Sequence, residues 1–404
     1  MVLSAGRYEY VIIGAGLAGA SAIGGIREID GNGPILLMGA EKHLPYDRPP
    51  LSKKLWSGKK KVEEIFIKDR KYYEENGVTL LEGRKAVSVD PVGKTVTDEK
   101  GGRHSYKKLL IATGGAPRRL PIPGGQTEGI CYFRTLDDYL AARETSRKTG
   151  LAALVIGGGF IGSEIAAALS VNGVKVTMLF PEGHIASRVF PAYLGKAVQE
   201  EFIRKGVTVL NEDRPASIEK KRDGFLVRTA GGRALEAGML IAGIGISPET
   251  ALAESASLKL EDGIAVNEYL ETSAPDIYAA GDNAHFPYIA LGKRMRVEHW
   301  DNALNQGRQA GRNMAGAHEP YDYMPYFFSD LFEFGYEAVG EVDASLETYA
   351  DWTEENRKGT VYYLRDGVVR GAMMCGVWGK VEQARELIKK RERADRLGLS
   401  GAIR

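Results

Sequence analysis

Three glycines near the start of the chain have the spacing of a phosphate-binding turn. They are Gly14, Gly16 and Gly19, and they follow an apolar run at residues 10–13 that predicts a buried parallel strand. In such a turn the first glycine permits a sharp bend, the second lets a pyrophosphate approach the backbone, and the third lets the next helix pack closely. The free amides and positive end of that helix attract phosphate. One copy of this pattern is weak evidence on its own, because glycine-rich turns are common.

A second copy of the pattern occurs further along the chain. Its glycines are Gly157, Gly159 and Gly162, which follow a strand expected at residues 154–156 and precede a helix expected to begin at Ser163. Two complete strand–loop–helix units predict two bound dinucleotides. Hydride passes between a flavin and a nicotinamide, so the two copies indicate an oxidoreductase that binds both.

An acidic residue follows each unit at the distance where such folds bind a ribose hydroxyl. Glu41 and Glu182 stand about 20 residues after Gly19 and Gly162, respectively. A surface glutamate in a turn is an equally good interpretation of Glu41.

Two further strands, expected at residues 109–111 and 277–280, end in small or acidic residues that suit a nearby ligand. These residues are Ala112, Thr113, Gly114, Gly281 and Asp282. A turn aspartate is the alternative interpretation of Asp282.

Composition excludes several classes of protein. The chain has 404 residues, enough for two or three domains, and a formal net charge of +1 that points to neither nucleic acid nor a membrane. No apolar run approaches the roughly 18 residues of a membrane span. The two cysteines, Cys131 and Cys375, form no metal or redox motif, and the six histidines lack zinc-ligand spacing, so no metal site is expected. The stretch before the first strand is too short for a targeting peptide, which predicts a cytoplasmic protein.

The end of the chain predicts strands followed by a helix. Strands expected at residues 360–364 and 368–374 enclose Asp366 and Gly367, a hairpin-turn signal, and a charged helix is expected at residues 381–393. The basic residues of this helix alternate with glutamate, which is typical of a solvated face rather than of a nucleic-acid site.

Taken together, the motifs resemble the two-dinucleotide-binding flavoproteins of the glutathione-reductase fold. Within that group the chain is similar to the oxygenase-coupled ferredoxin reductases and to apoptosis-inducing factor. The resemblance covers about residues 8–390 and rests on residues 14–19, 44–56, 112–115, 157–164, 278–282, 296–299 and 328–331.

The resemblance implies an α/β protein with two Rossmann-like dinucleotide-binding domains and a C-terminal α+β domain. The FAD-binding domain would be in two pieces, residues 1–115 and 247–325. The NAD-binding domain would occupy residues 116–246, and the C-terminal domain residues 326–404.

The resemblance also implies which residues hold the cofactors. They are Gly14, Gly16, Ala18, Gly19, Glu41, Arg48, Lys53, Val87, Ala112, Thr113, Gly114, Arg134, Gly157, Gly159, Phe160, Ile161, Gly162, Glu164, Glu182, Gly245, Gly281, Asp282, Glu298, His299 and Phe328.

Two of these residues are the implied catalytic ones. Lys53 and Glu164 would form an ion pair beside the hydride-accepting nitrogen of the flavin, with Glu164 in the first turn of the second cofactor helix. Phe160 would gate the nicotinamide face.

The chain departs from the family pattern at two positions. Ala40 stands where relatives carry the ribose-binding acid, so Glu41 would serve instead. Phe328 stands where relatives have tryptophan against the flavin, which puts acceptor specificity in doubt.

The implied function is that of an FAD-dependent NADH oxidoreductase passing electrons through FAD to a ferredoxin or rubredoxin. The alternative is a redox-gated scaffold or slow NADH oxidase resembling apoptosis-inducing factor, with a long-lived charge-transfer complex. A disulfide reductase would need a cysteine pair, which residues 44–56 lack. NADH and the electron carrier are the expected partners, without nucleic acid or membrane. The oligomeric state is open, with a homodimer as one possibility.

Overall fold

The computed structural model describes residues 6–403, and the chain forms two compact units. Unit 1 contains the chain up to Asp47, Val62–Ala116 and Ser247–Pro325, and unit 2 contains Arg48–Lys61, Pro117–Ile246 and the chain from Tyr326 onward. Residues 1–5, where the expected first domain and the short N-terminal stretch begin, lie outside the described residues, as does residue 404. The division into four segments stays a prediction.

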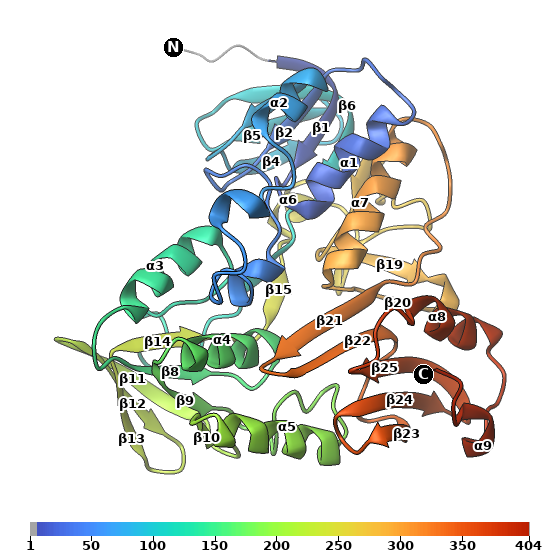
Figure 1. Cartoon of the computed structure of the whole chain (residues 1–404). Coiled ribbons are helices and arrows are strands. Elements are labelled where there is room, and N and C mark those ends of the chain that lie inside the picture. The colour runs from blue at the N-terminus through green and yellow to red at the C-terminus, as the bar shows by residue number, and fades with distance from the viewer. Residues whose placement is uncertain (1–5, 404) are drawn as a thin grey trace. The chain divides into compact units, whose positions relative to one another are not determined.

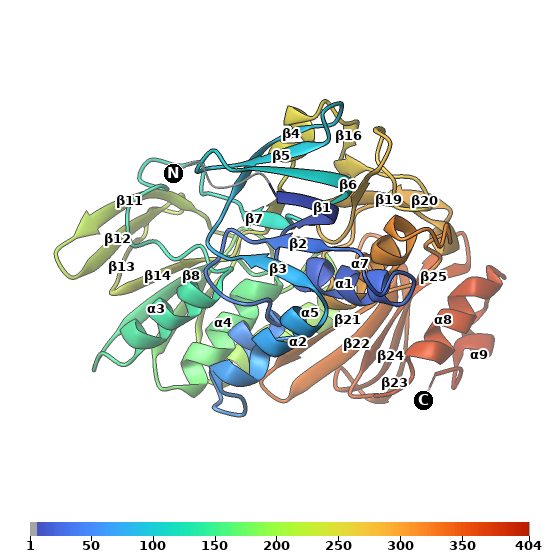
Figure 2. The same cartoon turned by 90° about the horizontal axis from the view of Figure 1, so that it is seen from above.

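Unit 1 is organised by a largely parallel sheet with helices packed beside it (Figures 1 and 2). Its main elements are β1 (Gly6–Ile13), α1 (Leu17–Arg27), β2 (Ile35–Met38), α2 (Arg70–Glu75), β3 (Val78–Leu81), β4 (Ala86–Asp90), β5 (Thr95–Asp98), β6 (Arg103–Ile111), α6 (Ala251–Ser255), β16 (Leu260–Glu261), β17 (Gly263–Ala265), β18 (Ile277–Ala279), β19 (Ala284–Tyr288), β20 (Lys293–Met295) and α7 (Trp300–Met314).

The parallel strands bring the predicted motifs of unit 1 to one edge. Strands β3, β2, β1 and β6 lie side by side in that order, and β18 runs parallel to β6. Val11 and Ile12 of β1 have no exposed surface, as expected for strands covered on both faces. Because β1, β6 and β18 are parallel, the residues that follow each of them meet at the same edge, where open α/β sheets bind ligands.

Helices α1 and α7 lie side by side and pack very closely (Figures 1 and 2). Glycines make this possible: a Cβ at Gly25 would stand 2.0 Å from the carbonyl oxygen of Arg308, and one at Gly311 would stand 2.1 Å from that of Ala22. Any side chain at these glycines would therefore push the two helices apart.

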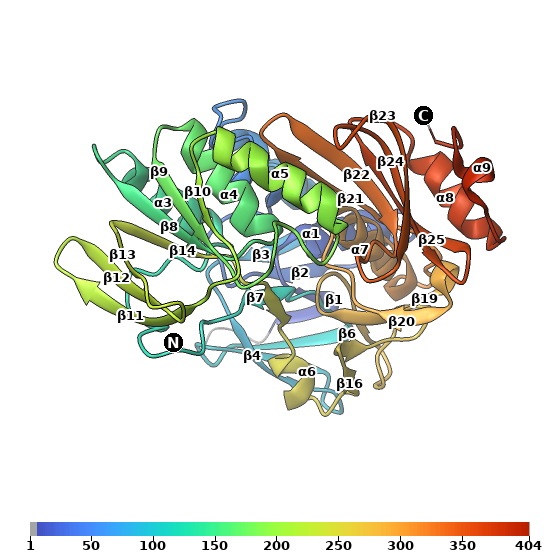
Figure 3. The same cartoon turned by 90° about the horizontal axis from the view of Figure 1, so that it is seen from below.

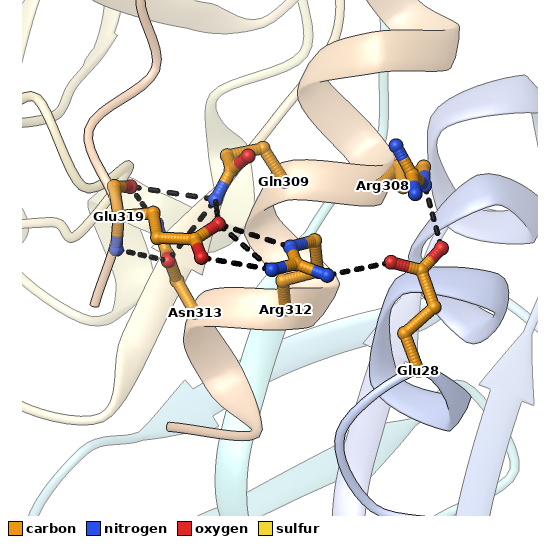
Figure 4. A network of polar contacts seen from close by, with 6 residues as sticks. All are labelled: Glu28, Arg308, Gln309, Arg312, Asn313 and Glu319. Carbon is orange, nitrogen blue, oxygen red and sulfur yellow. Dashed lines mark hydrogen bonds and ion pairs between the residues drawn. The ribbon is translucent and has the colours of Figure 1, made fainter. Parts of the chain in front are cut away.

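Ion pairs link the ends of these two helices (Figure 4). Glu28, just after α1, binds Arg308 at 2.6 Å and Arg312 at 2.7 Å, and Arg312 also binds Glu319 at 2.8 Å. The hydrogen bonds from both arginines lower the pKa of Glu28. Arg312 thus connects α1, α7 and the segment that follows α7.

Unit 2 combines a parallel sheet with antiparallel ones (Figures 1 and 3). Its elements are a 3-10 helix (Pro49–Ser52), α3 (Leu136–Ser146), β8 (Ala152–Ile156), α4 (Phe160–Val171), β9 (Lys175–Leu179), α5 (Ala192–Arg204), β10 (Thr208–Leu210), β11 (Pro215–Lys221), β12 (Gly224–Thr229), β13 (Ala234–Ala237), β14 (Met239–Ala242), β21 (Tyr326–Leu331), β22 (Phe334–Gly340), β23 (Glu347–Glu354), β24 (Lys358–Arg365), β25 (Val368–Cys375), α8 (Val381–Lys390) and α9 (Arg396–Leu399). Two short strands, β7 (Gly115–Pro117) and β15 (Ile246–Pro248), stand where the chain passes between the units.

The sheets of unit 2 follow the expected pattern. Strands β10, β9, β8 and β14 form a parallel sheet in that order, with α5 beside β10 (Figure 3). The last strands form an antiparallel sheet in the order β21, β22, β25, β24 and β23, and α8 packs on β22 and β25. The hairpin between β24 and β25 is confirmed, since Asp366 and Gly367 have φ of +53° and +77°.

Two predicted helix boundaries are wrong. The helix expected to begin at Ser163 begins at Phe160, because Gly159 has the extended backbone of an N-cap residue, with φ of −80° and ψ of −170°. The helix expected to reach residue 393 ends at Lys390, because Arg391 adopts a left-handed φ of +53° and Arg393 pairs with Val368. Glu164 is consequently the fifth residue of α4 and does not lie in its first turn.

Candidate active site

The first glycine turn has the geometry of a dinucleotide cradle. Gly14 has φ of +112°, and a Cβ there would stand 2.1 Å from the carbonyl oxygen of Ala112. A Cβ at Gly19 would stand 2.0 Å from the carbonyl oxygen of Gly14, whereas one at Gly16 would meet no atom within 4 Å. The outer two glycines are therefore required by the fold, and the middle one leaves open space in front of α1.

The second glycine turn repeats this geometry in unit 2. Gly157 has φ of +115° and stands against the carbonyl oxygen of Gly243, which a Cβ would approach to 2.3 Å. A Cβ at Gly162 would stand 2.0 Å from the carbonyl oxygen of Gly157, and one at Gly159 would meet no atom within 4 Å.

The helices that follow the two turns begin with backbone N–H groups that no side chain caps, as suits a phosphate ligand. Gly16 and Gly159 are the N-cap residues of α1 and α4, and neither helix has a side-chain cap or an acidic residue in its first turn. The backbone N–H groups at a helix start need acceptors, and the helix dipole favours an anion there. Both turns fit the pyrophosphate of a dinucleotide.

The two predicted ribose-binding acids lie beyond the strands that neighbour these turns. Glu41 follows β2, and its carboxylate accepts a hydrogen bond from the Tyr46 hydroxyl at 2.5 Å. A Cβ at Gly39 would stand 2.5 Å from that of Ala15, so the segment leading to Glu41 touches the first glycine turn. Glu182 follows β9 and is exposed. Their ribose-binding roles stay predictions.

Side-chain amides that the sequence did not indicate support the other segments at this edge of unit 1. Asn283 donates to the Thr113 hydroxyl at 2.9 Å, and the Gln306 carbonyl accepts from the Gly281 N–H at 2.8 Å. Neither Asn283 nor Gln306 has exposed surface. Asn283 could have been suspected because it follows Gly281 and Asp282, but no local signal marked Gln306.

Several other predicted cofactor residues of unit 1 lie at the same edge. Ala18 is next to Gly281, where a Cβ would stand 3.1 Å from that of Ala18. Arg296 donates to the Asp282 carbonyl at 3.0 Å and forms an ion pair with Glu298. Arg296 was not predicted as a site residue, yet it links two that were.

The remaining predicted residues divide between the units. Val87 lies on β4 of unit 1 and is exposed. In unit 2, Arg48 donates to the Arg134 carbonyl at 2.8 Å, which brings two predicted contacts together.

Three other predicted residues of unit 2 lie at the start of α4 or after β14. Phe160 packs against Phe327 with ring centroids 5.7 Å apart, and Ile161 is exposed. Gly245 has φ of +93°, and its carbonyl oxygen accepts from the Arg118 N–H at 3.0 Å.

Lys53 and Glu164 form the predicted ion pair. The ammonium nitrogen of Lys53 lies 3.1 Å from Oε1 of Glu164, with the two side chains 10% and 6% exposed. Lys53 also donates to the Phe328 carbonyl at 3.4 Å and stands 4.5 Å from the centre of the Phe328 ring. An ammonium has three N–H donors, and these are the two acceptors that the described part of the chain supplies. One donor is therefore available to a ligand.

His299, at the N-cap of α7, is held in its neutral form. Burial lowers the pKa of its imidazole to about 4, and the charge of Asp282 opposes this only in part. The unfolded chain, with an ordinary histidine pKa of about 6.5, binds a proton that the folded chain does not. The free energy of unfolding should therefore decrease as the pH falls from about 6.5 to about 4.

We expect the variant His299→Gln to flatten this pH dependence. The measurement is the urea midpoint at several pH values across the window, for the variant and the unaltered protein. A variant whose midpoint decreases as steeply as that of the unaltered protein would show that another group is responsible.

The two glycine turns, each between a parallel strand and a helix without a side-chain cap, define an oxidoreductase fold that binds two dinucleotides. Residues 8–307 match the family model of the pyridine nucleotide-disulphide oxidoreductases, to which this chain belongs, and residues 310–358 match the C-terminal domain of apoptosis-inducing factor. FAD and NAD(H) are the cofactors of this family, as expected from the two turns.

Similar proteins are found in both branches of the expected resemblance. The chain is 34% identical to apoptosis-inducing factor 1 of Dictyostelium discoideum, covering 95% of this chain and 79% of the other. It is also 34% identical to the ferredoxin reductase subunit of a 5,5′-dehydrodivanillate O-demethylase from Sphingobium, covering 98% and 97%. The solved complex of putidaredoxin reductase with putidaredoxin matches with a TM-score of 0.89 and 30% identity, covering 97% of this chain and 95% of the matched chain.

Two features of other protein classes are not found in residues 6–403. None of the helices there has the length and hydropathy needed to cross a membrane. The same residues contain no cluster of three or more side chains suited to a metal ion.

Proposed function

We propose that this protein transfers electrons from NADH through FAD to an iron–sulfur carrier protein of the ferredoxin type. The observation that carries the proposal is the similarity to a ferredoxin reductase subunit over nearly the full length of both chains. The structural similarity to putidaredoxin reductase, solved together with its carrier, supports the same conclusion. A rubredoxin was the other carrier expected from the sequence and stays a second probe.

The residues of the chain have distinct roles in this proposal. When bound, FAD would supply the chemistry that takes up the electron pair of a hydride and releases the electrons one at a time. The N–H groups at the starts of α1 and α4 hold the phosphates, and the acids beyond β2 and β9 hold ribose hydroxyls. Lys53, with one N–H donor available, places a fixed positive charge to stabilise negative charge that develops on the cofactor.

The cysteines argue against disulfide reduction, although the family name includes it. Cys131 and Cys375 are free, and burial raises the pKa of the Cys131 thiol to about 12 and that of Cys375 still further. Thiol chemistry requires the thiolate, which these surroundings disfavour. Free cysteines are usual in a reducing compartment, so we place the protein in the cytoplasm. A homodimer stays a prediction.

A second candidate function has its own support. The match of residues 310–358 to the C-terminal domain of apoptosis-inducing factor favours a redox-gated scaffold that turns over slowly. The two functions differ in how long the reduced protein persists.

The test is an anaerobic titration with NADH followed by addition of a two-iron ferredoxin. A carrier reductase should reduce the ferredoxin at a rate in the enzyme range of about 1–1000 s⁻¹. A long-wavelength charge-transfer band that persists after ferredoxin is added would contradict the proposal and favour the scaffold.

We expect a preference for NADH over NADPH that depends on Glu182. Its carboxylate would bind the adenosine ribose and repel a 2′-phosphate. Replacing Glu182 by glutamine should raise kcat/KM for NADPH relative to NADH about tenfold, or ~1.4 kcal/mol, within the range for two charges about 4 Å apart near a surface.

The matched control for this prediction is Glu200→Gln, which removes an exposed carboxylate from α5. Equal kcat/KM values for the two nucleotides in the unaltered protein would contradict the assignment of Glu182.

A further inference from the structure

We infer that Ser52 and Ser329 are positioning residues that hold the Lys53–Glu164 pair in its working geometry. The inference rests on the proposed function, since it concerns the same pair. The two serines come from the first and the last of the three chain segments of unit 2, Ser52 from the 3-10 helix Pro49–Ser52 and Ser329 from strand β21, and both donate to one carboxylate.

The carboxylate of Glu164 is held at both oxygens. Ser52 Oγ donates to Oε2 and Ser329 Oγ donates to Oε1, each at 2.5 Å, while the Lys53 ammonium lies 3.1 Å from Oε1. Hydroxyl-to-carboxylate bonds of this length are among the stronger hydrogen bonds in proteins. With one hydroxyl donor on each oxygen and the Lys53 ammonium also at Oε1, the plane of the carboxylate cannot rotate without breaking a bond.

The orientation of Glu164 determines that of Lys53. The ammonium is held between Oε1 of Glu164 and the Phe328 carbonyl. Because the ammonium is tetrahedral, the positions of these two acceptors fix the direction of its third N–H. Phe328 and Ser329 are neighbours on β21, so one strand contacts both members of the pair. A rotation of the carboxylate would therefore redirect the donor that serves the ligand.

A titratable phenol also lies close to the pair. The phenol of Tyr336 on β22 is fully buried, and burial together with the charge of Glu164 raises its pKa well above the usual value, while Ser329 acts in the opposite direction. Tyr336 is thus neutral and supplies no counter-charge. The ammonium of Lys53 is the positive group that faces Glu164, and the serines add donors without adding charge.

Apart from Glu164, the groups that these serine hydroxyls face are uncharged, and for Ser329 this group is the phenol of Tyr336, its partner on β22. Ser52 Oγ has a second acceptor, the Pro49 carbonyl, at the long distance of 3.5 Å, and both serines are almost completely buried, 3% and 2% exposed. Removing a donor from such a site leaves a buried acceptor without a hydrogen bond, which costs free energy of folding.

The sharpest test compares Ser329→Thr with Ser329→Val. The two side chains have the same shape and differ only in the hydroxyl, and both suit a strand. Stopped-flow reduction of bound FAD by NADH should be within about twofold of the unaltered rate for threonine. It should be slower by about tenfold for valine, the effect of one hydrogen bond to a charged group. The KM for NADH and the FAD content should be unchanged in both.

Ser52→Ala reports on the other oxygen and should also slow the reduction about tenfold. The control is Ser170→Ala, which removes a hydroxyl from α4, the helix that carries Glu164. Ser170 donates to the Lys205 carbonyl at 3.1 Å, and its replacement should leave the rate unchanged. Added to Glu164→Ala, neither serine substitution should slow the reaction further. The same non-additivity should appear in the urea midpoints, which do not depend on turnover.

Equal rates for Ser329→Thr and Ser329→Val would overturn the inference, as would additive effects in the Glu164→Ala background. Failure of the proposed function looks different. If the unaltered protein reduces no iron–sulfur carrier, the proposed function is wrong, while the serine comparison in flavin reduction and the urea midpoints can still be decided.

Discussion

Replacing Glu164 by glutamine should slow the reduction of bound FAD by NADH about a hundredfold, or ~2.7 kcal/mol, while FAD remains bound. Glutamine keeps the volume and one acceptor oxygen but removes the charge that Lys53 faces at 3.1 Å. Breaking one partner of a buried ion pair costs about 3–5 kcal/mol, because the remaining charge is left uncompensated. The loss should appear in the rate because the ammonium is no longer held toward the ligand.

Removing the other partner should have a similar effect on the same step. Lys53→Met keeps most of the side-chain volume, and the matched control Lys54→Met changes the exposed neighbouring lysine, which should leave the rate unaltered. Stopped-flow traces and the FAD content of all the variants provide the measurement. Unaltered rates in both Glu164→Gln and Lys53→Met would show that the pair is structural.

The second large effect is expected at the middle glycine of the first turn. Gly16→Ala should leave the fold intact and weaken FAD binding by tenfold or more, ~1.4 kcal/mol. A Cβ at Gly16 would meet no protein atom within 4 Å, and Gly16 has an extended φ of −94° that alanine tolerates. The methyl group would instead occupy the space that the pyrophosphate needs.

The neighbouring glycines provide the contrast. Gly14→Ala should destabilise the protein itself, because its φ of +112° and the carbonyl oxygen of Ala112 leave no room for a side chain. Gly24→Ala, inside the same helix α1 and with no atom within 4 Å of its Cβ, should leave FAD affinity unaltered and should not destabilise the protein, because alanine is the better helix former.

Titration of the apoproteins with FAD and thermal unfolding distinguish these outcomes. Unaltered FAD affinity in Gly16→Ala would contradict the assignment of this turn. An apoprotein of Gly16→Ala as unstable as that of Gly14→Ala would show that the middle glycine serves the fold instead.

The sequence alone was sufficient for features that depend on short-range geometry. A glycine turn between a strand and a helix is specified by residues close together in the chain, since Gly19 is required by the carbonyl of Gly14 only five residues earlier. The strand expected at residues 154–156, which is the end of β8, and the turn at Asp366–Gly367 were predicted for the same reason. The repetition of the turn then made two dinucleotides the natural interpretation.

Helix starts without a side-chain cap were less certain. The residue types of Phe160 and Ile161 do not distinguish a loop from the first turn of α4. The extended backbone of Gly159, its N-cap residue, marks where the helix begins. The ion pair of Lys53 with Glu164 was anticipated only through the resemblance to known flavoproteins.

Only the tertiary structure could reveal what holds that pair. Ser52 and Ser329 stand 112 and 165 residues from Glu164 along the chain, and the Phe328 carbonyl stands 275 residues from Lys53. Burial in the fold also lowers the pKa of His299, because the charged imidazolium loses part of its hydration there. Local sequence determines which turns can form, whereas packing between distant segments determines which polar groups become partners. This is because removal from water makes every buried donor and acceptor dependent on the groups that the fold brings within reach.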